Sequence, residues 1–275
     1  MNEKSYGNIN VIQWYPGHMA KAKREISEIL RFVDIAVIIG DARLPKSSIN
    51  PEIFDILGNK PYIIALNKAD LIPPLLSGGG IDKVDDGGVR ISSLDGTNFG
   101  QLKTAINNKI HTAKLREKSR GLENRAIRIL VVGCPNTGKS AFINKFAGRS
   151  AMEVANRAGV TKKQQWIKVR SGGQNYDLLD TPGILPPKFE TRAQGERLAW
   201  IGAIKEDILD KIEIAVALCG FLHNIEDNNE KYDKFLEIGR AKGLLIRGGE
   251  IDEERTAKLL LTDFRSGKLG KYILE

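Results

Sequence analysis

The chain has 275 residues, 41% of them hydrophobic and 28% charged, with a formal net charge of +8 and a pI near 9.3. These proportions fit a soluble globular protein with one large or two ordinary domains. The longest apolar run, around residues 214–222, is too short to span a membrane, and two cysteines cannot form a disulfide framework. Because no apolar leader follows Met1, we expect a cytoplasmic protein without membrane contact.

Residues 20–118 alternate apolar runs with helical patterns. The apolar runs predict buried strands at 35–40, 62–66 and 89–94. Apolar residues at helical spacing predict helices at 20–30, 53–57 and 99–117. Residues 73–89 are rich in proline and glycine and predict a loop.

The second half of the chain changes character after Gly183. Before it, strands are expected at 127–132, 163–170 and 175–180, and the Ser-Gly-Gly-Gln turn at 171–174 is typical of a hairpin. After it, helices alone are expected, at 198–209, 211–223, 232–242 and 252–264. The pattern predicts an α/β domain over residues 1–200, with segment 1–31 included, and a smaller all-helical domain over 201–275.

The motif GCPNTGKS at residues 133–140 follows an apolar strand and opens a helical pattern. This is the context of a P-loop, whose backbone N–H groups and helix dipole favour a phosphate. A match is expected in roughly 2% of shuffled sequences, so an ordinary glycine turn is a poor explanation. The predicted phosphate-binding residues are Asn136, Thr137, Gly138, Lys139 and Ser140.

A second motif, NKAD at residues 67–70, directly follows the strand at 62–66. The Asp70 carboxylate could accept two hydrogen bonds from guanine and would lose both with adenine, so such a site discriminates between the bases. Asn67 and Lys68 belong to the same predicted guanine site, and Ser92 and Ser93, at the end of the next predicted strand, form its companion base loop. Together with the P-loop, this motif indicates a guanine nucleotide.

Three Asp-x-x-Gly patterns occur, and position alone distinguishes them. Only Asp180 and Gly183 stand at the end of a strand downstream of the P-loop. A magnesium-linked carboxylate and a γ-phosphate amide are needed there. The motif order is unusual, because ordinary GTPases place the P-loop before the base motif. The motifs can still meet at one nucleotide, because the site depends on where the strand ends lie in space. A circular permutation is tolerated when the termini of the unpermuted fold lie close together.

The permuted order, with WYPGHM at 14–19, DARLP at 41–45, NKAD, GCPNTGKS and DTPG at 180–183, resembles the circularly permuted P-loop GTPases of the ribosome biogenesis GTPase A type. GGEI at 248–251 and DFRSGKLG at 263–270 extend the resemblance over nearly the whole chain. It implies a circularly permuted GTPase sheet with a helical RNA-binding tail. It also implies a monomeric factor for the large ribosomal subunit, with rRNA and ribosomal proteins as partners. The glycine-rich loop at 78–88 departs from the family's composition.

Roles follow from position and from the resemblance. Lys139 is expected to neutralise phosphate charge and Ser140 to bind Mg²⁺. The resemblance implies Thr161 as the switch threonine on Mg²⁺ and γ-phosphate, Asp180 as a magnesium ligand through water, and Asn136 as a potassium ligand. Gly183 supplies the γ-phosphate amide.

Ile184 stands where Ras-like enzymes carry a water-orienting glutamine, so we expect slow intrinsic hydrolysis of GTP. The family resemblance implies that the Tyr-Pro-Gly-His segment lies near the switch regions, so His18 is the candidate substitute. Contact with RNA and a structural turn are its alternative roles.

Two other functions remain open on the sequence. A P-loop ATPase or small-molecule kinase would share GCPNTGKS but leaves NKAD unexplained. An RNA-binding scaffold that uses GTP as a structural ligand would keep both motifs. Basic stretches at 103–128 and 157–170 fit nucleic-acid contact and an ordinary solvated surface equally well.

Overall fold

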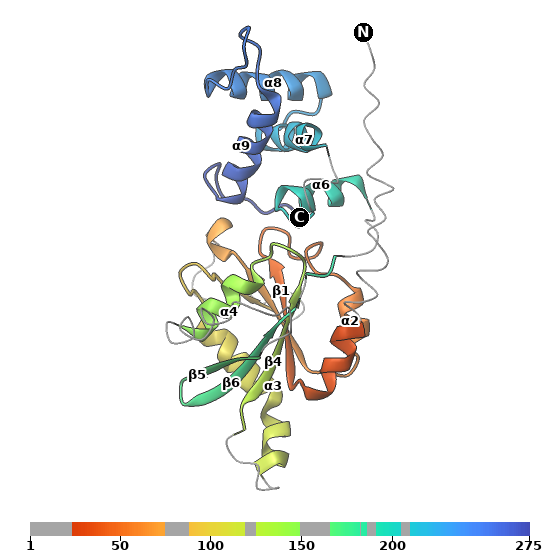
Figure 1. Cartoon of the computed structure of the whole chain (residues 1–275), viewed down its shortest axis with the longest axis vertical. Helices are drawn as coiled ribbons and strands as arrows, with labels where there is room; N and C mark the ends of the chain where they lie inside the picture. The colour runs from red at the N-terminus through yellow and green to blue at the C-terminus, as the bar shows by residue number, and fades with distance from the viewer. Residues whose placement is uncertain are drawn as a thin grey trace. The chain divides into compact units, whose positions relative to one another are not determined.

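A computed structural model describes residues 24–74, 88–118, 125–148, 166–181, 183–185, 191–204 and 210–275, without the side chains of 112–118 (Figure 1). The described chain divides into two compact units. The sheet unit holds residues 24–185 and 272–275, and the helical unit holds residues 191–271.

The sheet unit is built on six strands in the order β3-β2-β1-β4-β6-β5. The strands are β1 (Ile35–Asp41), β2 (Tyr62–Asn67), β3 (Val89–Arg90), β4 (Ile127–Gly133), β5 (Trp166–Ser171) and β6 (Gln174–Asp180). All neighbours pair in parallel except β5 and β6. The register places Asp41 beside Asn67 and Ile39 beside Gly133, so three motif-bearing strands end at one edge of the sheet.

Helices cover both faces of this sheet, as Figure 1 shows. On one face, α3 (Phe99–Lys118) and α4 (Lys139–Ala147) bury Phe99, Phe142 and Phe146 against the strands. On the other face lie α2 (Glu52–Leu57), a helical turn at residues 24–29 and a 3-10 turn, η2 (Leu30–Phe32). A sheet covered twice explains why the central strands are continuous apolar runs. The α/β fold predicted from the sequence is confirmed.

Two local predictions in the sheet unit have different outcomes. The hairpin is confirmed, with Gly172 and Gly173 at φ 58° and 78° forming the two-residue turn between β5 and β6. The strand expected at 89–94 is wrong beyond Arg90, because a turn begins at Ser92. The Ser92 carbonyl accepts a hydrogen bond from Gly96 N at 2.9 Å, and this turn leads into α3.

The helical unit contains α6 (Arg192–Trp200), α7 (Lys211–His223), α8 (Asn228–Ala241) and α9 (Glu253–Arg265). Thr191, Asp210, Asp227 and Asp252 cap their N-termini through side-chain oxygens. The Arg265 guanidinium donates to the carbonyl groups of Ala199 and Trp200, at 2.8 and 3.0 Å, which ties α9 to the end of α6.

The helix predicted at 198–209 is wrong at both limits. It begins at Arg192, because Thr191 is its cap, and it ends at Trp200. Gly202, at φ 78°, donates to Ala199 O at 2.9 Å, and Ala203 donates to Leu198 O at 2.8 Å. This left-handed glycine closure stops the helix. Residues 205–209 lie outside the described part, in whose helices no stretch is long and apolar enough to cross a membrane.

Candidate functional site

The P-loop joins β4 to α4. Gly138 stands at φ 94°, in the left-handed region, immediately before the helix. Lys139 Nζ donates to Gly133 O at 3.2 Å and to Cys134 O at 2.8 Å, so the ammonium group folds back over the loop. Thr137 is buried and donates its hydroxyl to Cys134 O at 2.9 Å. The loop is thus held in shape by its own carbonyl groups.

Burial lowers the pKa of Lys139, because the interior disfavours its charge, while Asp180 opposes this shift by charge attraction. The Lys139 side chain is only 8% exposed. The thiol of Cys134 is also buried, which raises its pKa to about 12 and keeps it protonated. Cys134 therefore serves the loop through its carbonyl group rather than as a thiolate.

Asn67 connects the NKAD motif to the P-loop. Its Nδ2 donates to Thr137 O at 3.0 Å, and its Oδ1 accepts from Ser93 N at 3.0 Å. One side-chain amide therefore holds together the base motif, the companion base loop and the phosphate loop. The approach is so close that a Cβ on Gly138 would lie 2.3 Å from Asn67 Nδ2.

Lys68 makes a second connection to the P-loop. The residue is in the left-handed conformation at φ 63°, and its Nζ donates to Asn136 O at 2.7 Å. Asn136 is left-handed as well, at φ 57°. Asparagine tolerates this conformation, whereas lysine rarely adopts it, so the strain lies at Lys68, whose contact with Asn136 supports it.

The remaining predicted base residues lie around Asn67. Asp70 is the middle residue of a 3-10 turn, η3 (Ala69–Leu71), and is half-buried. Among the described residues, none donates a hydrogen bond to its carboxylate or pairs with it. The Ser93 hydroxyl is buried and has no hydrogen-bond partner among the described residues. Ser92 is buried too, but its hydroxyl accepts from Asp95 N at 3.4 Å, so it supports the turn.

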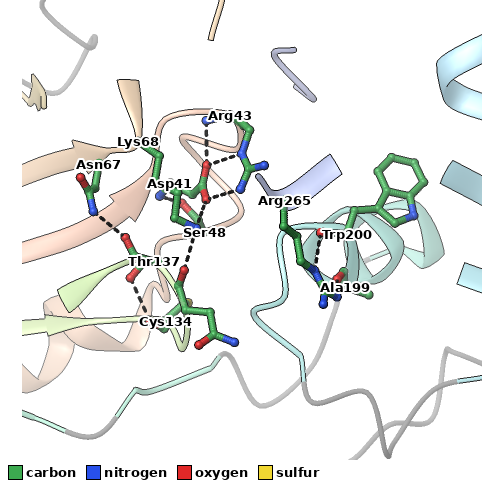
Figure 2. A network of polar contacts seen from close by, with 11 residues as sticks. Asp41, Arg43, Ser48, Asn67, Lys68, Cys134, Thr137, Ala199, Trp200 and Arg265 are labelled. Carbon is green, nitrogen blue, oxygen red and sulfur yellow. Dashed lines mark hydrogen bonds and ion pairs between the residues drawn. The ribbon is translucent and has the colours of Figure 1, made fainter. Parts of the chain in front are cut away.

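Asp41, at the end of β1, forms a buried ion network that the strand pattern alone did not predict. Arg43 donates to both of its carboxylate oxygens, at 3.0 and 2.9 Å, and Lys68 Nζ lies 2.9 Å from one of them (Figure 2). Ser48 Oγ accepts from Asp41 N at 2.8 Å. The only signal in the sequence was the DARLP motif at 41–45.

Two opposing causes act on the Asp41 carboxyl. Burial by itself would raise its pKa, because the side chain is fully enclosed. The hydrogen bond from Arg43 and the positive charge of Lys68 outweigh burial, so the pKa of Asp41 is lowered. Asp41 therefore stays ionised and holds the Lys68 ammonium in place beside Asn136.

Ser140 and Asp180 offer an oxygen pair beside Lys139. Ser140 Oγ donates to Asp180 Oδ2 at 3.1 Å, while Asp180 Oδ1 is buried without a partner among the described residues. No three His, Cys, Asp or Glu side chains gather as a metal cage in the described ranges. The pair fits Mg²⁺, which prefers oxygen ligands and is usually held by one or two protein groups together with phosphates and water.

The DTPG segment returns to the P-loop after β6. A Cβ on Gly183 would lie 2.7 Å from Pro135 N, so the two backbones are in close contact. Ile184 N donates to Gly133 O at 3.1 Å, and the Ile184 side chain is 1% exposed within the apolar cluster under α2. The position that follows DTPG is therefore part of the core.

With this geometry established, comparison with known proteins places the chain. A family model described as 50S ribosome-binding GTPase matches residues 128–246. A ribosome biogenesis GTPase A from Bacillus cereus is 41% identical to this chain. The match covers 96% of this chain and 94% of the Bacillus cereus protein. The chain belongs to the ribosome biogenesis GTPase A family. A family member from Thermotoga maritima is 32% identical over 96% of this chain.

Solved structures of the family agree with the fold. Those of T. maritima YlqF, described as GDP-bound and GNP-bound, are 27% identical to this chain and have TM-scores of 0.60 and 0.61. The match to the GDP-bound structure covers 92% of this chain and 98% of the solved chain. The match to the GNP-bound structure covers 93% and 97%. The mixed sheet described above is thus the sheet of the ribosome biogenesis GTPase A family.

The sequence-predicted residues of this family member divide into two groups. The structure brings together Asn67, Lys68, Asp70, Ser92, Ser93, Asn136, Thr137, Gly138, Lys139, Ser140, Asp180 and Gly183 at one edge of the sheet. His18, Thr161 and residues 75–87 of the predicted loop lie outside the described residues, so their roles stay predictions. Asp41 and Arg43 are the site residues that motif reading did not assign.

Proposed function

We propose that the chain binds GTP, hydrolyses it to GDP and phosphate, and acts as an assembly factor for the large ribosomal subunit. The carrying observation is the hydrogen bond from Asn67 Nδ2 to Thr137 O, because it joins the base motif to a phosphate loop 70 residues away. The names of the relatives support the ribosomal role. The reversed motif order supports a circular permutation of the GTPase sheet.

The phosphate side of the proposed site consists of the loop 136–140 and Gly183. Lys139 neutralises β- and γ-phosphate charge, backbone N–H groups of Thr137, Gly138 and Ser140 bind the phosphate oxygens, and Gly183 donates its amide to the γ-phosphate. Mg²⁺, when bound, balances the charge of these phosphates. Ser140 would hold it directly, Asp180 through water, and Thr161 on the switch segment.

The base side consists of Asp70 with Asn67, Lys68, Ser92 and Ser93. Asp70 is the proposed acceptor for the guanine N1–H and 2-amino groups, and its carboxylate has no partner in the described part of the sheet unit. Adenine would leave that half-buried carboxylate without its donors, which supports discrimination against ATP. Lys68 and Asn67 set the distance between base and phosphates.

Slow intrinsic hydrolysis is part of the proposal. Ile184 is enclosed in the core, so this position has no polar group to orient water. His18 is the proposed substitute, acting when a ribosomal particle completes the site. K⁺ is the proposed second ion, with Asn136 as its ligand, and it would supply positive charge near the transferred phosphate.

The proposed partners are the large ribosomal subunit, its rRNA and ribosomal proteins. The net charge of +8 supports an RNA surface. We propose a cytoplasmic monomer whose GTPase domain is the sheet unit and whose RNA-binding domain is the helical unit. The domain bounds of 1–200 and 201–275 expected from the sequence differ from these units, because α6 (Arg192–Trp200) belongs to the helical unit and residues 272–275 belong to the sheet unit.

The decisive experiment measures phosphate release from GTP in K⁺ or Na⁺, with and without large subunits, after competition of GTP against ATP for binding. GTP preference with K⁺- and subunit-stimulated release supports the proposal. Equal competition by ATP would favour the P-loop ATPase or kinase. Tight GTP binding with no release in any condition would favour the RNA-binding scaffold.

A further inference from the structure

Residues 272–275 leave the helical unit and belong to the sheet unit. Tyr272 N donates to Leu71 O at 3.3 Å, and Leu274 N donates to Arg43 O at 2.8 Å. The Leu274 side chain is 3% exposed, whereas its neighbour Ile273 is 42% exposed. The segment is therefore docked through the buried Leu274 side chain and through backbone hydrogen bonds, while Ile273 faces solvent.

Glu275 adds polar contacts at the far end of this segment. Its carboxylate accepts hydrogen bonds from Lys46 N, from Ser47 N at 2.8 Å and from Ser47 Oγ at 2.6 Å. Hydrogen bonds to a charged acceptor are stronger than neutral ones. Residues 272–275 are therefore fixed at both ends against two different loops.

These two loops are the ones that position Lys68. One, residues 41–48, carries Asp41 and Arg43, and the other, residues 67–71, carries Lys68. The Lys68 ammonium bridges from Asp41, at 2.9 Å, to Asn136 O in the P-loop, at 2.7 Å. Tyr272 is bonded to the second loop and Leu274 to the first, so the segment ties them together within a few residues of this bridge.

We propose that residues 272–275 form a positioning strap for the guanine side of the site. The strap holds loop 41–48 against loop 67–71 and thereby keeps Lys68 fixed between Asp41 and Asn136. Its hydrogen bonds to Leu71, Arg43 and Ser47 lie on the two loops around Lys68, so we expect a larger effect on nucleotide binding than on binding of phosphates alone. The inference rests on the proposed binding of guanine nucleotides.

The strap is also joined by a peptide bond to the helical unit. The sheet unit resumes at Tyr272, directly after the last residue of the helical unit, Lys271. A partner that displaces residues 272–275 would loosen Lys68 and weaken nucleotide binding. By linkage, bound nucleotide would favour the docked strap to the same extent.

The test uses the full chain with Leu274→Ala, Glu275→Ala and the matched control Ile273→Ala. Affinities are measured for GTP, GDP and inorganic tripolyphosphate, which occupies a P-loop without a base. Leu274→Ala should weaken GTP and GDP equally, by about tenfold, and Glu275→Ala by about threefold. Tripolyphosphate affinity should fall by less than GDP affinity in both variants, and the turnover rate at saturating GTP should stay at the wild-type value.

Glu275 is exposed, so its variant tests the strap without opening the core. Unchanged GDP affinity in both Leu274→Ala and Glu275→Ala would overturn the strap. An equal loss of tripolyphosphate affinity would also overturn the strap, because it would indicate general destabilisation of the site. An effect of Ile273→Ala as large as that of Leu274→Ala would overturn it for the same reason. Failure of the wild-type chain to bind GTP or GDP would instead overturn the proposed function.

Discussion

Gly138 and Asn67 are in such close contact that a Cβ on the glycine would lie 2.3 Å from the asparagine Nδ2. Gly138 also stands at φ 94°, where a residue with a side chain is strained. The phosphate loop and the base motif therefore depend on each other, because one can keep its conformation only if the other leaves this space open.

Gly138→Ala should separate the two loops. The added methyl group must displace Asn67, so we expect guanine nucleotide affinity to fall by about 100-fold, while the free energy of unfolding falls by about 1–3 kcal/mol. Titration of fluorescent GDP and urea unfolding measure the two effects. Gly100→Ala is the control, because nothing lies within 4 Å of its added Cβ. Wild-type GDP affinity in Gly138→Ala would contradict the expected coupling.

Asn67→Ala should cost both stability and affinity. It leaves Ser93 N and Thr137 O without their 3.0 Å partners, and each unsatisfied buried group costs about 1–3 kcal/mol. We expect a lower urea midpoint and weaker binding of GDP. Asn107→Ala, which within the described residues removes a 3.5 Å contact to Tyr176 and changes neither motif, should change both quantities little. Equal effects of the two variants would argue against a linking role for Asn67.

Asp41→Asn tests the buried ion network through pH. The variant leaves Arg43 facing a neutral amide, so we expect a loss of about 3 kcal/mol at neutral pH. The folded-state pKa of Asp41 lies below its ordinary value of 3.8, so its ionisation stabilises the fold above that value. This contribution is lost as the pH falls through the folded-state pKa.

Urea unfolding over a pH series checks this expectation. The gap in unfolding free energy between wild type and Asp41→Asn should be constant at neutral pH and narrow only below the ordinary pKa of 3.8. A gap that closes well above this value would mean that the Asp41 pKa is not lowered. Asp55→Asn, on the exposed side of α2, controls for the loss of an ordinary carboxylate.

Ile184→Gln should not create a faster enzyme. The side chain at this position is enclosed in the apolar cluster under α2, so a glutamine there is buried among apolar side chains. We expect a loss of about 2–4 kcal/mol in unfolding free energy and no rise in the rate of phosphate release from GTP. Ile184→Val, which keeps the apolar contact, should cost about 1 kcal/mol. A faster release rate in Ile184→Gln would show that the side chain can turn towards the phosphates.

Local patterns in the sequence were sufficient for much of the fold and for the motif positions. The apolar runs at 35–40, 62–66 and 127–132 predicted central strands because a doubly covered sheet buries both faces of each strand. Predictions from local sequence patterns were wrong where a single residue ends a helix or a strand. Gly202 closes α6 and Ser92 starts a turn, and neither event changes the apolar periodicity around it.

The sequence by itself determined the P-loop, the NKAD motif and the α/β class, since each depends on neighbouring residues in the chain. Only the tertiary structure decided that Asn67 holds Thr137, that Asp41 holds Lys68 and that Leu274 docks near both. These contacts join residues far apart in the chain, and their energies depend on burial and on parallel strand register. Neither quantity is a property of any short stretch of sequence.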